Sequence, residues 1–116
     1  MKYWILNANG DPEPTDDPIV WSVWFERASR DRSRIVAQDR DERKGAPDVL
    51  VSTVFLGLDH AFTGGPPVLW ETLVMGGRLD GEMVRYTSRD AALVGHAAMC
   101  RRVFHAEKNP VKKKTR

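Results

Sequence analysis

The chain has 116 residues, of which 41% are hydrophobic, and it carries a formal net charge of +2 and a single cysteine, Cys100. This length and composition predict one domain with a hydrophobic core. A single cysteine excludes an internal disulfide and a metal site built from several cysteines. The longest apolar run is much shorter than the roughly 20 residues that cross a bilayer, so we expect a cytoplasmic protein with no membrane partner.

The first part of the chain predicts a short strand and a helix. Residues 3–6 are an apolar run, and the turn signal Asn9-Gly10-Asp11-Pro12 follows them. Asp17 and Pro18 are typical of a helix N-cap and a first helical residue, and they predict a helix over about residues 18–30. The apolar stripe of this helix contains Val20, Trp21, Trp24, Phe25 and Ala28.

Further short strands follow this helix. Residues 34–37 predict one strand, and a densely charged loop connects it to the next strand, over residues 49–58. The strand over residues 49–58 has apolar residues on both faces, so we expect both faces to be covered. The last strands are expected over residues 68–75 and 82–86, each after a turn rich in glycine.

The end of the chain predicts a second helix and a basic tail. Thr87-Ser88-Arg89-Asp90 resembles a capping box and predicts a helix over about residues 88–105. One face of this helix should lie on the sheet, and it carries Ala92, Leu93, His96, Met99, Cys100 and Val103. Pro110 is expected to stop the helix, and residues 110–116 are expected to form a disordered, basic tail.

These elements together predict an α+β fold. We expect a small antiparallel sheet of four or five strands, packed by the C-terminal helix, with the Trp-bearing N-terminal helix closing another side. Residues 1–109 would form this single domain.

Several short motifs stand out over residues 49–100. They are Gly57-Leu58-Asp59-His60, Glu71-Thr72, Arg85-Tyr86 and Gly95-His96. This pattern resembles a family of small proteins of tailed phages and prophages, with a weaker similarity over residues 19–37. The resemblance implies a phage or prophage setting, and therefore the cytoplasm of a host cell, but it implies no activity.

The most concentrated polar group lies at the mouth of the central hairpin. Asp59 and His60 end one strand, and Glu71 lies on the next strand, near Gly57 if the hairpin closes symmetrically. Two carboxylates beside a histidine can catalyse proton transfer or hold a divalent metal. The alternative is structural: His60 caps the loop, Asp59 accepts hydrogen bonds from turn amides, and Glu71 pairs with Arg85.

Two further residues complete the candidate ligand-binding set. Tyr86 is expected beside Glu71 and His60, and His96 could meet the sheet near Glu71 or Tyr86. The alternative for His96 is a core histidine with a hydrogen-bonded partner. Cys100 is expected to be a small buried hydrophobe. No residue specifies a cofactor or metal, and His60 and Glu71 are candidates for catalysis.

Three functions are compatible with these features. The first is a non-catalytic accessory module that binds a host protein or a small ligand through the hairpin mouth, and interference with host defence is one form that the resemblance suggests. The second is a metal-assisted hydrolase that uses His60, Asp59 and Glu71. The third is nucleic-acid binding, with strong salt dependence, through Lys112, Lys113, Lys114 and Arg116. A solvated appendage is the alternative for that tail.

Overall fold

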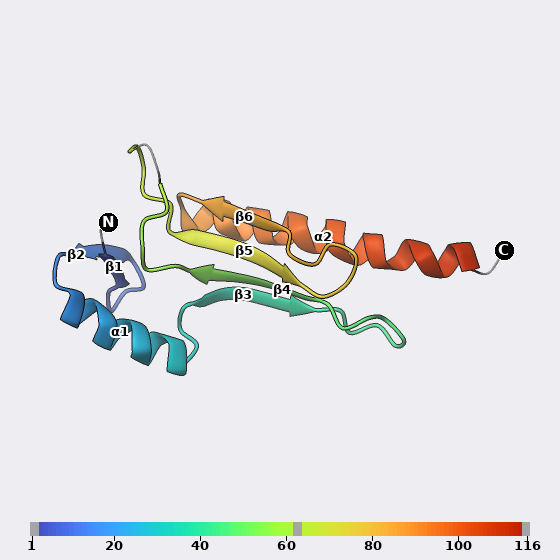
Figure 1. The fold of residues 1–116 in the computed structure, drawn as a ribbon, viewed down its shortest axis with the longest axis horizontal. Coiled ribbons are helices and arrows are strands. Elements are labelled where there is room, and N and C mark those ends of the chain that lie inside the picture. The colour runs from blue at the N-terminus through green and yellow to red at the C-terminus, as the bar shows by residue number, and fades with distance from the viewer. Residues whose placement is uncertain (1–2, 62–63, 115–116) are drawn as a thin grey trace.

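The structure is a computed structural model that describes residues 3–61 and 64–114, with side chains up to residue 106 (Figure 1). The elements in chain order are β1 (Tyr3–Leu6), β2 (Pro12–Thr15), α1 (Pro18–Arg30), β3 (Ile35–Arg40), β4 (Leu50–Phe55), β5 (Trp70–Met75), β6 (Met83–Tyr86) and α2 (Arg89–Lys114). No helix among the described residues is long and apolar enough to cross a membrane.

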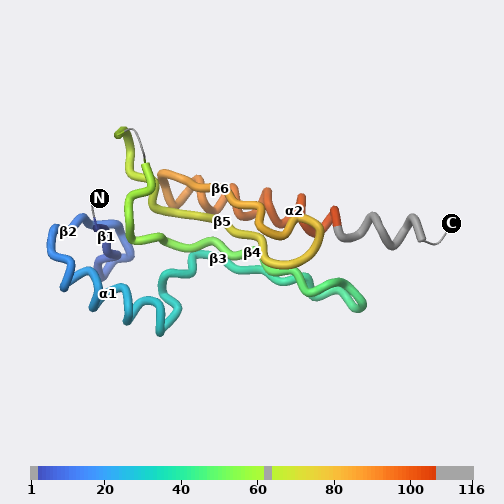
Figure 2. Tube along the Cα trace, in the orientation of Figure 1, coloured from blue at the N-terminus to red at the C-terminus, as the bar shows by residue number. Residues whose placement is uncertain are grey.

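The main sheet is an antiparallel meander in the order β3-β4-β5-β6, and α2 lies along one of its faces (Figure 1). The α+β class and the packing of the C-terminal helix on the sheet are therefore confirmed. The trace in Figure 2 shows the β3–β4 connection projecting at the end of the sheet away from α1. The opposite face of β4 carries buried Ser52 and half-buried Leu50 and Val54, so this face is covered less completely than the face under α2.

The first strand does not join the main sheet as a regular member. β1 pairs with β2 in a separate two-stranded sheet, in which Trp4 lies opposite Pro14. Proline lacks an amide hydrogen and is found mainly in edge strands, so Pro14 limits the pairing of another strand with β2. β1 contacts the backbone of the segment that follows β4. The contacts are one isolated β-bridge, between Tyr3 and Leu58, and a 2.9 Å hydrogen bond from the Trp4 amide to the Gly57 carbonyl.

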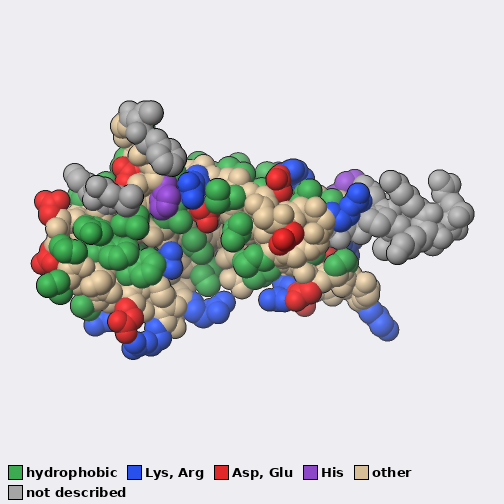
Figure 3. All heavy atoms as spheres, in the orientation of Figure 1, with side chains coloured by type: hydrophobic (Ala, Val, Ile, Leu, Met, Phe, Trp, Pro, Cys, Tyr) green, Lys and Arg blue, Asp and Glu red, His purple; other side chains and the backbone are tan. Residues whose placement is uncertain are grey.

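Helix α1 begins and ends where the sequence predicts. The Asp17 carboxylate accepts hydrogen bonds from the amides of Ile19 and Val20, as an N-cap does. The helix packs on the β1–β2 hairpin, and its Trp24 reaches the main core, where its ring centre lies 5.8 Å from that of Phe55. Val20 is wrongly placed in the predicted apolar stripe because 46% of its surface is exposed. Figure 3 shows hydrophobic side chains gathered over this end of the molecule.

Between the sheet and α2 the core consists of two apolar clusters. One cluster lies at the end away from α1 and contains Val49, Val51, Val74, Met99 and Val103. The other lies toward α1 and contains Phe55, Leu69, Trp70 and Ala92. Buried polar residues separate them: Thr53 and Thr72 are fully buried and His96 is 5% exposed. The interface between helix and sheet therefore has a polar layer in its middle.

The end of α2 differs from the prediction. Ser88 caps the first turn by accepting a 3.0 Å hydrogen bond from the Ala91 amide, as expected. The helical backbone then continues to Lys114 through Pro110, whereas the sequence predicted an end near His105. The side chains from residue 107 onward lie outside the described part of the chain, so the separate basic tail stays a prediction.

Candidate functional site

At the hairpin mouth, Asp59 and His60 shape their own loop. One Asp59 carboxylate oxygen accepts hydrogen bonds from the amides of Ala61, at 2.8 Å, and Val68, at 3.0 Å. The amides of Ala61 and then Val68 hold the pKa of Asp59 below its usual value. His60 Nδ1 lies 2.8 Å from the Leu58 carbonyl oxygen. These contacts match the structural interpretation of both residues.

Glu71 lies on the face of the sheet that α2 does not cover. It pairs across the strands with Val54 and Arg85, not near Gly57 as the sequence suggested. The Arg85 guanidinium donates a 3.0 Å hydrogen bond to the Glu71 carboxylate. Tyr86, one residue further along β6, points to the opposite face, where it meets Thr72. Glu71 and Tyr86 therefore lie on opposite faces of the sheet, and the prediction that they lie side by side is wrong.

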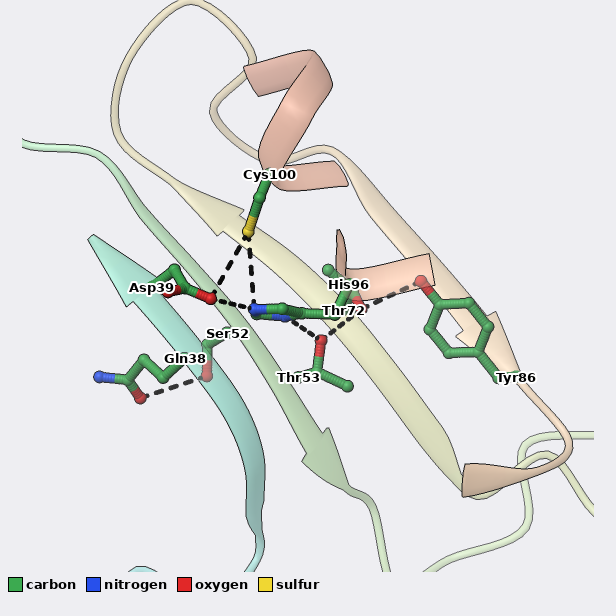
Figure 4. A network of polar contacts seen from close by, with 8 residues as sticks. All are labelled: Gln38, Asp39, Ser52, Thr53, Thr72, Tyr86, His96 and Cys100. Carbon is green, nitrogen blue, oxygen red and sulfur yellow. Dashed lines mark hydrogen bonds and ion pairs between the residues drawn. The ribbon is translucent and has the colours of Figure 1, made fainter. Parts of the chain in front are cut away.

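Tyr86 and His96 instead meet in the polar layer under α2, through two buried threonines (Figure 4). The Tyr86 hydroxyl donates a 3.0 Å hydrogen bond to Thr72 Oγ1. Thr72 Oγ1 lies 2.5 Å from Thr53 Oγ1, and Thr53 Oγ1 lies 2.7 Å from His96 Nδ1. We call these three residues, Thr53, Thr72 and Tyr86, the hydroxyl chain.

Local structure explains how the hydroxyl chain forms. Thr53 on β4 and Thr72 on β5 are direct antiparallel partners, so both side chains point to the face covered by α2. Gly95 makes room for the Tyr86 ring, because a Cβ atom at this position would lie 2.3 Å from the Tyr86 hydroxyl. The following residue on α2, His96, then faces the threonines.

On its other side, the His96 ring meets two more polar side chains. Nε2 lies 2.7 Å from an Asp39 carboxylate oxygen and 3.5 Å from Cys100 Sγ. The Cys100 thiol also lies 3.8 Å from the same Asp39 oxygen. We call Asp39, His96 and Cys100 the three-residue cluster. It joins the edge strand β3 to two successive turns of α2 (Figure 4).

The three-residue cluster runs from the core to the surface. The His96 side chain is 6% exposed, whereas the Asp39 side chain is 59% exposed. Burial, and then the neighbouring Asp39 carboxylate, raise the pKa of the Cys100 thiol to about 11. Asp39 and Cys100 also approach the same ring nitrogen, whereas a catalytic triad needs the nucleophile and the carboxylate on opposite nitrogens. The arrangement does not provide an activated cysteine nucleophile.

The same arrangement suits a metal ion. The ligand atoms of Asp39, His96 and Cys100 all lie within 4.8 Å of one another. In a tetrahedral zinc site, metal–ligand distances of about 2.0–2.3 Å separate the ligand atoms by roughly 3.4–3.6 Å. The two distances to Cys100 Sγ, 3.5 and 3.8 Å, are close to this spacing. The 2.7 Å contact between Asp39 and His96 is a hydrogen bond that must open to admit an ion.

Sequence reasoning named His96 but missed Asp39, Thr53 and the polar role of Cys100. Asp39 lies in the charged segment Gln38-Asp39-Arg40-Asp41, where solvation is the simplest interpretation of any single charge. The available signal was the four-residue spacing of His96 and Cys100, which places both on one face of a helix. Asp39, the partner on β3, could be identified only from the strand pairing, which brings it beside α2.

Comparison with protein-family models, with curated proteins and with solved structures finds no match to this chain. The phage-like resemblance therefore stays a prediction. Several residues of its motifs nevertheless lie together in the structure, since Thr72, Tyr86, Gly95 and His96 all take part in the contacts between α2 and the sheet.

Proposed function

We propose that this protein is a small metal-binding module, and that Asp39, His96 and Cys100 hold a divalent transition metal ion such as Zn²⁺. One observation carries the proposal: three ligand atoms of different chemistry, from β3 and α2, converge within 4.8 Å of one another. A buried core histidine needs one hydrogen-bond partner on each nitrogen, and Asp39 already supplies that partner for Nε2. The additional approach of Cys100 is what a metal site requires.

The chemistry of the ligands indicates the class of metal. A thiolate together with an imidazole favours zinc and similar transition metals, whereas calcium and magnesium prefer oxygen ligands alone. Three protein ligands leave one position of a tetrahedral site for water or a small ligand. The exposed Asp39 carboxylate provides a route by which an ion can enter from solvent.

This proposal keeps the class of a non-catalytic binding module but moves its site. The hydrolase alternative needed His60, Asp59 and Glu71 to act together, and these side chains have other partners within the loop or on Arg85. Binding of a host protein stays a prediction, and so does binding of nucleic acid through the basic C-terminal residues.

The proposal is tested by titrating metal-free protein with Co²⁺ and Zn²⁺. We expect one equivalent of Co²⁺ to give the intense absorption of a cobalt–thiolate bond, and Zn²⁺ to displace it. Calorimetry with Zn²⁺ gives the affinity. Because an ion that binds only the folded state stabilises it by about 2.7 kcal/mol at 100 times its Kd, thermal melts should shift upward with Zn²⁺.

Matched variants identify the ligands. Cys100→Ala and Asp39→Asn change partly or largely exposed side chains, and each should weaken Zn²⁺ binding at least tenfold while the protein stays folded. His60→Ala and His105→Ala remove the other histidines and should leave the affinity unchanged. Stoichiometric binding that survives Cys100→Ala, or no saturable binding by the parent protein, would contradict the proposed function.

A further inference from the structure

We propose that the hydroxyl chain, Thr53, Thr72 and Tyr86, determines which ring nitrogen of His96 carries the proton, and that its hydrogen bonds reverse direction when a metal ion binds Nε2. This inference rests on the proposed metal site. It concerns positioning residues, because none of the three hydroxyls touches the cluster's ligand atoms other than through the His96 ring.

In the metal-free protein, the direction that we assign to the chain starts at Tyr86. The Tyr86 hydroxyl donates to Thr72, and the single Thr72 hydroxyl proton then serves the contact with Thr53. In this arrangement the Thr53 proton serves the contact with His96, and Nδ1 accepts it. His96 consequently carries its proton on Nε2, and this nitrogen donates to the Asp39 carboxylate 2.7 Å away.

A metal on Nε2 requires the opposite arrangement. Nε2 must then offer its lone pair, so the ring proton of neutral His96 lies on Nδ1 and donates to Thr53. Thr53 in turn donates to Thr72, and Thr72 donates to the Tyr86 oxygen. The protons balance as follows. His96 keeps one ring proton, whose position changes from Nε2 to Nδ1 by exchange with solvent, and the Cys100 thiol releases its proton to solvent. The hydroxyl groups of Thr53, Thr72 and Tyr86 rotate and keep their protons.

Burial makes the two directions exclusive. Thr53 and Thr72 are both fully buried, so a hydroxyl that loses its partner cannot turn to water instead. A mixed chain, in which Thr72 accepts from both Tyr86 and Thr53, would leave the proton of the buried Thr72 hydroxyl without a partner in the chain. The direction of all the contacts is therefore set together, and the Tyr86 hydroxyl, at the far end from the metal, changes from donor to acceptor.

The first test measures the proton position directly. Nitrogen-15 NMR of the protein with labelled histidine distinguishes Nδ1–H from Nε2–H, and the His96→Gln variant assigns the signals. We expect Nε2–H in the metal-free protein, and Nδ1–H with a metal-shifted Nε2 after Zn²⁺ addition. A proton on His96 Nδ1 in the metal-free protein would overturn the inference, whatever the affinity for Zn²⁺.

The second test uses variants that change one hydroxyl. Thr53→Val keeps the side-chain shape but removes the hydroxyl, and we expect it to weaken Zn²⁺ binding about 10- to 100-fold, as loss of a ligand's hydrogen-bond partner does. Thr53→Ser restores the hydroxyl and should bind within a few-fold of the parent. Tyr86→Phe removes the far end of the chain and should move the metal-free His96 population toward Nδ1–H, even if Thr53→Val fails to fold.

The outcomes separate this inference from the proposed function. If the parent binds Zn²⁺ but Thr53→Val and Tyr86→Phe bind it equally and show the parent's tautomers, the positioning role is wrong and the metal site stands. If the parent shows no Zn²⁺ binding, the metal site is wrong, and the predicted reversal is wrong with it. A purely structural role for the threonines predicts lower melting temperatures with unchanged tautomers.

Discussion

Gly95 occupies the position on α2 where the Tyr86 ring crosses the helix. An added Cβ atom there would lie 2.3 Å from the Tyr86 hydroxyl and from a ring carbon. Glycine in a helix normally costs stability relative to alanine, by roughly 0.8–1 kcal/mol, so its presence indicates that space matters more than helix propensity at this position. The hydroxyl chain depends on this residue as much as on its own members.

The effect of alanine at position 95 should therefore depend on Tyr86. We expect Gly95→Ala to destabilise the parent by about 1–3 kcal/mol, because the packed ring must move away. In a Tyr86→Ala background the Gly95→Ala change should stabilise the protein. The clash with the ring is then absent, and the higher helix propensity of alanine is the remaining effect. Urea unfolding of the four proteins in this cycle measures the coupling, and equal effects in both backgrounds would contradict the packing argument.

The carboxylate of Asp59 should make stability depend on pH in the acid range. Its pKa is lowered in the folded state by the amides of Ala61 and Val68, so its contribution is present above the unfolded value and is lost as the pH falls through the folded value. Asp59→Ala should destabilise the protein at pH 7 by roughly 1–3 kcal/mol. The stabilities of parent and variant should converge at the acid end of a pH series of denaturant melts, and a difference that persists there would argue against the amide contacts.

At the scale of elements, β4 is the centre of the fold. Its Phe55 is fully buried and makes edge contacts with the rings of Trp24 on α1, at 5.8 Å, and Trp70 on β5, at 5.5 Å. This ring therefore links the α1 end of the molecule to the main sheet. The register of β4 also places Thr53 opposite Thr72, so the same strand holds the polar layer.

Removing the Phe55 ring should therefore be costly. We expect Phe55→Ala to lower the free energy of unfolding by about 3–5 kcal/mol, a large share of the stability of a small domain. Met83→Ala is the control, because Met83 lies on edge strand β6 and is 46% exposed. This change should alter the free energy of unfolding by less than about 0.5 kcal/mol. A cooperative melt of Phe55→Ala within a few degrees of the parent would show that this contact is not central.

The elements themselves could largely be predicted from the sequence because their signals are local. The Asp17 cap, the β-branched run before Phe55 and the spacing of Ala92, His96 and Val103 each lie within one short segment of the chain. The pairing of β1 with β2, and not with the main sheet, depends on distant contacts that no local pattern encodes. The site was missed for the same reason, since Asp39 meets His96 across 57 positions.

The whole molecule is elongated, with principal extents of 60, 31 and 20 Å. The β1–β2 hairpin and α1 lie at one end, and α2 runs past the sheet at the other (Figure 1). Val103 is the last fully buried residue on α2 within the part whose side chains are described. Stability should therefore not depend on the last residues of the chain.

Deletion of residues 110–116 should leave the melting temperature unchanged, because the apolar contacts between α2 and the sheet, among the side chains that the structure describes, involve Met99, Val103 and Phe104 and lie before this segment. The segment contains Lys112, Lys113, Lys114 and Arg116. Any affinity of the full chain for nucleic acid should be lost on deletion and should fall steeply with added salt. A complex that resists salt and prefers one sequence would instead favour the nucleic-acid hypothesis.

The polar layer between the two apolar clusters also restricts how α2 can sit. An apolar seam alone would tolerate a helix displaced by one turn, because Ala92, Met99 and Val103 could exchange places with modest losses. Such a displacement would carry the His96 imidazole under an aliphatic cluster and leave both threonines facing hydrocarbon. The polar layer thus acts against misassembly. It contributes less to the stability of the native state than to the free-energy gap between the native packing and a packing in which α2 is displaced.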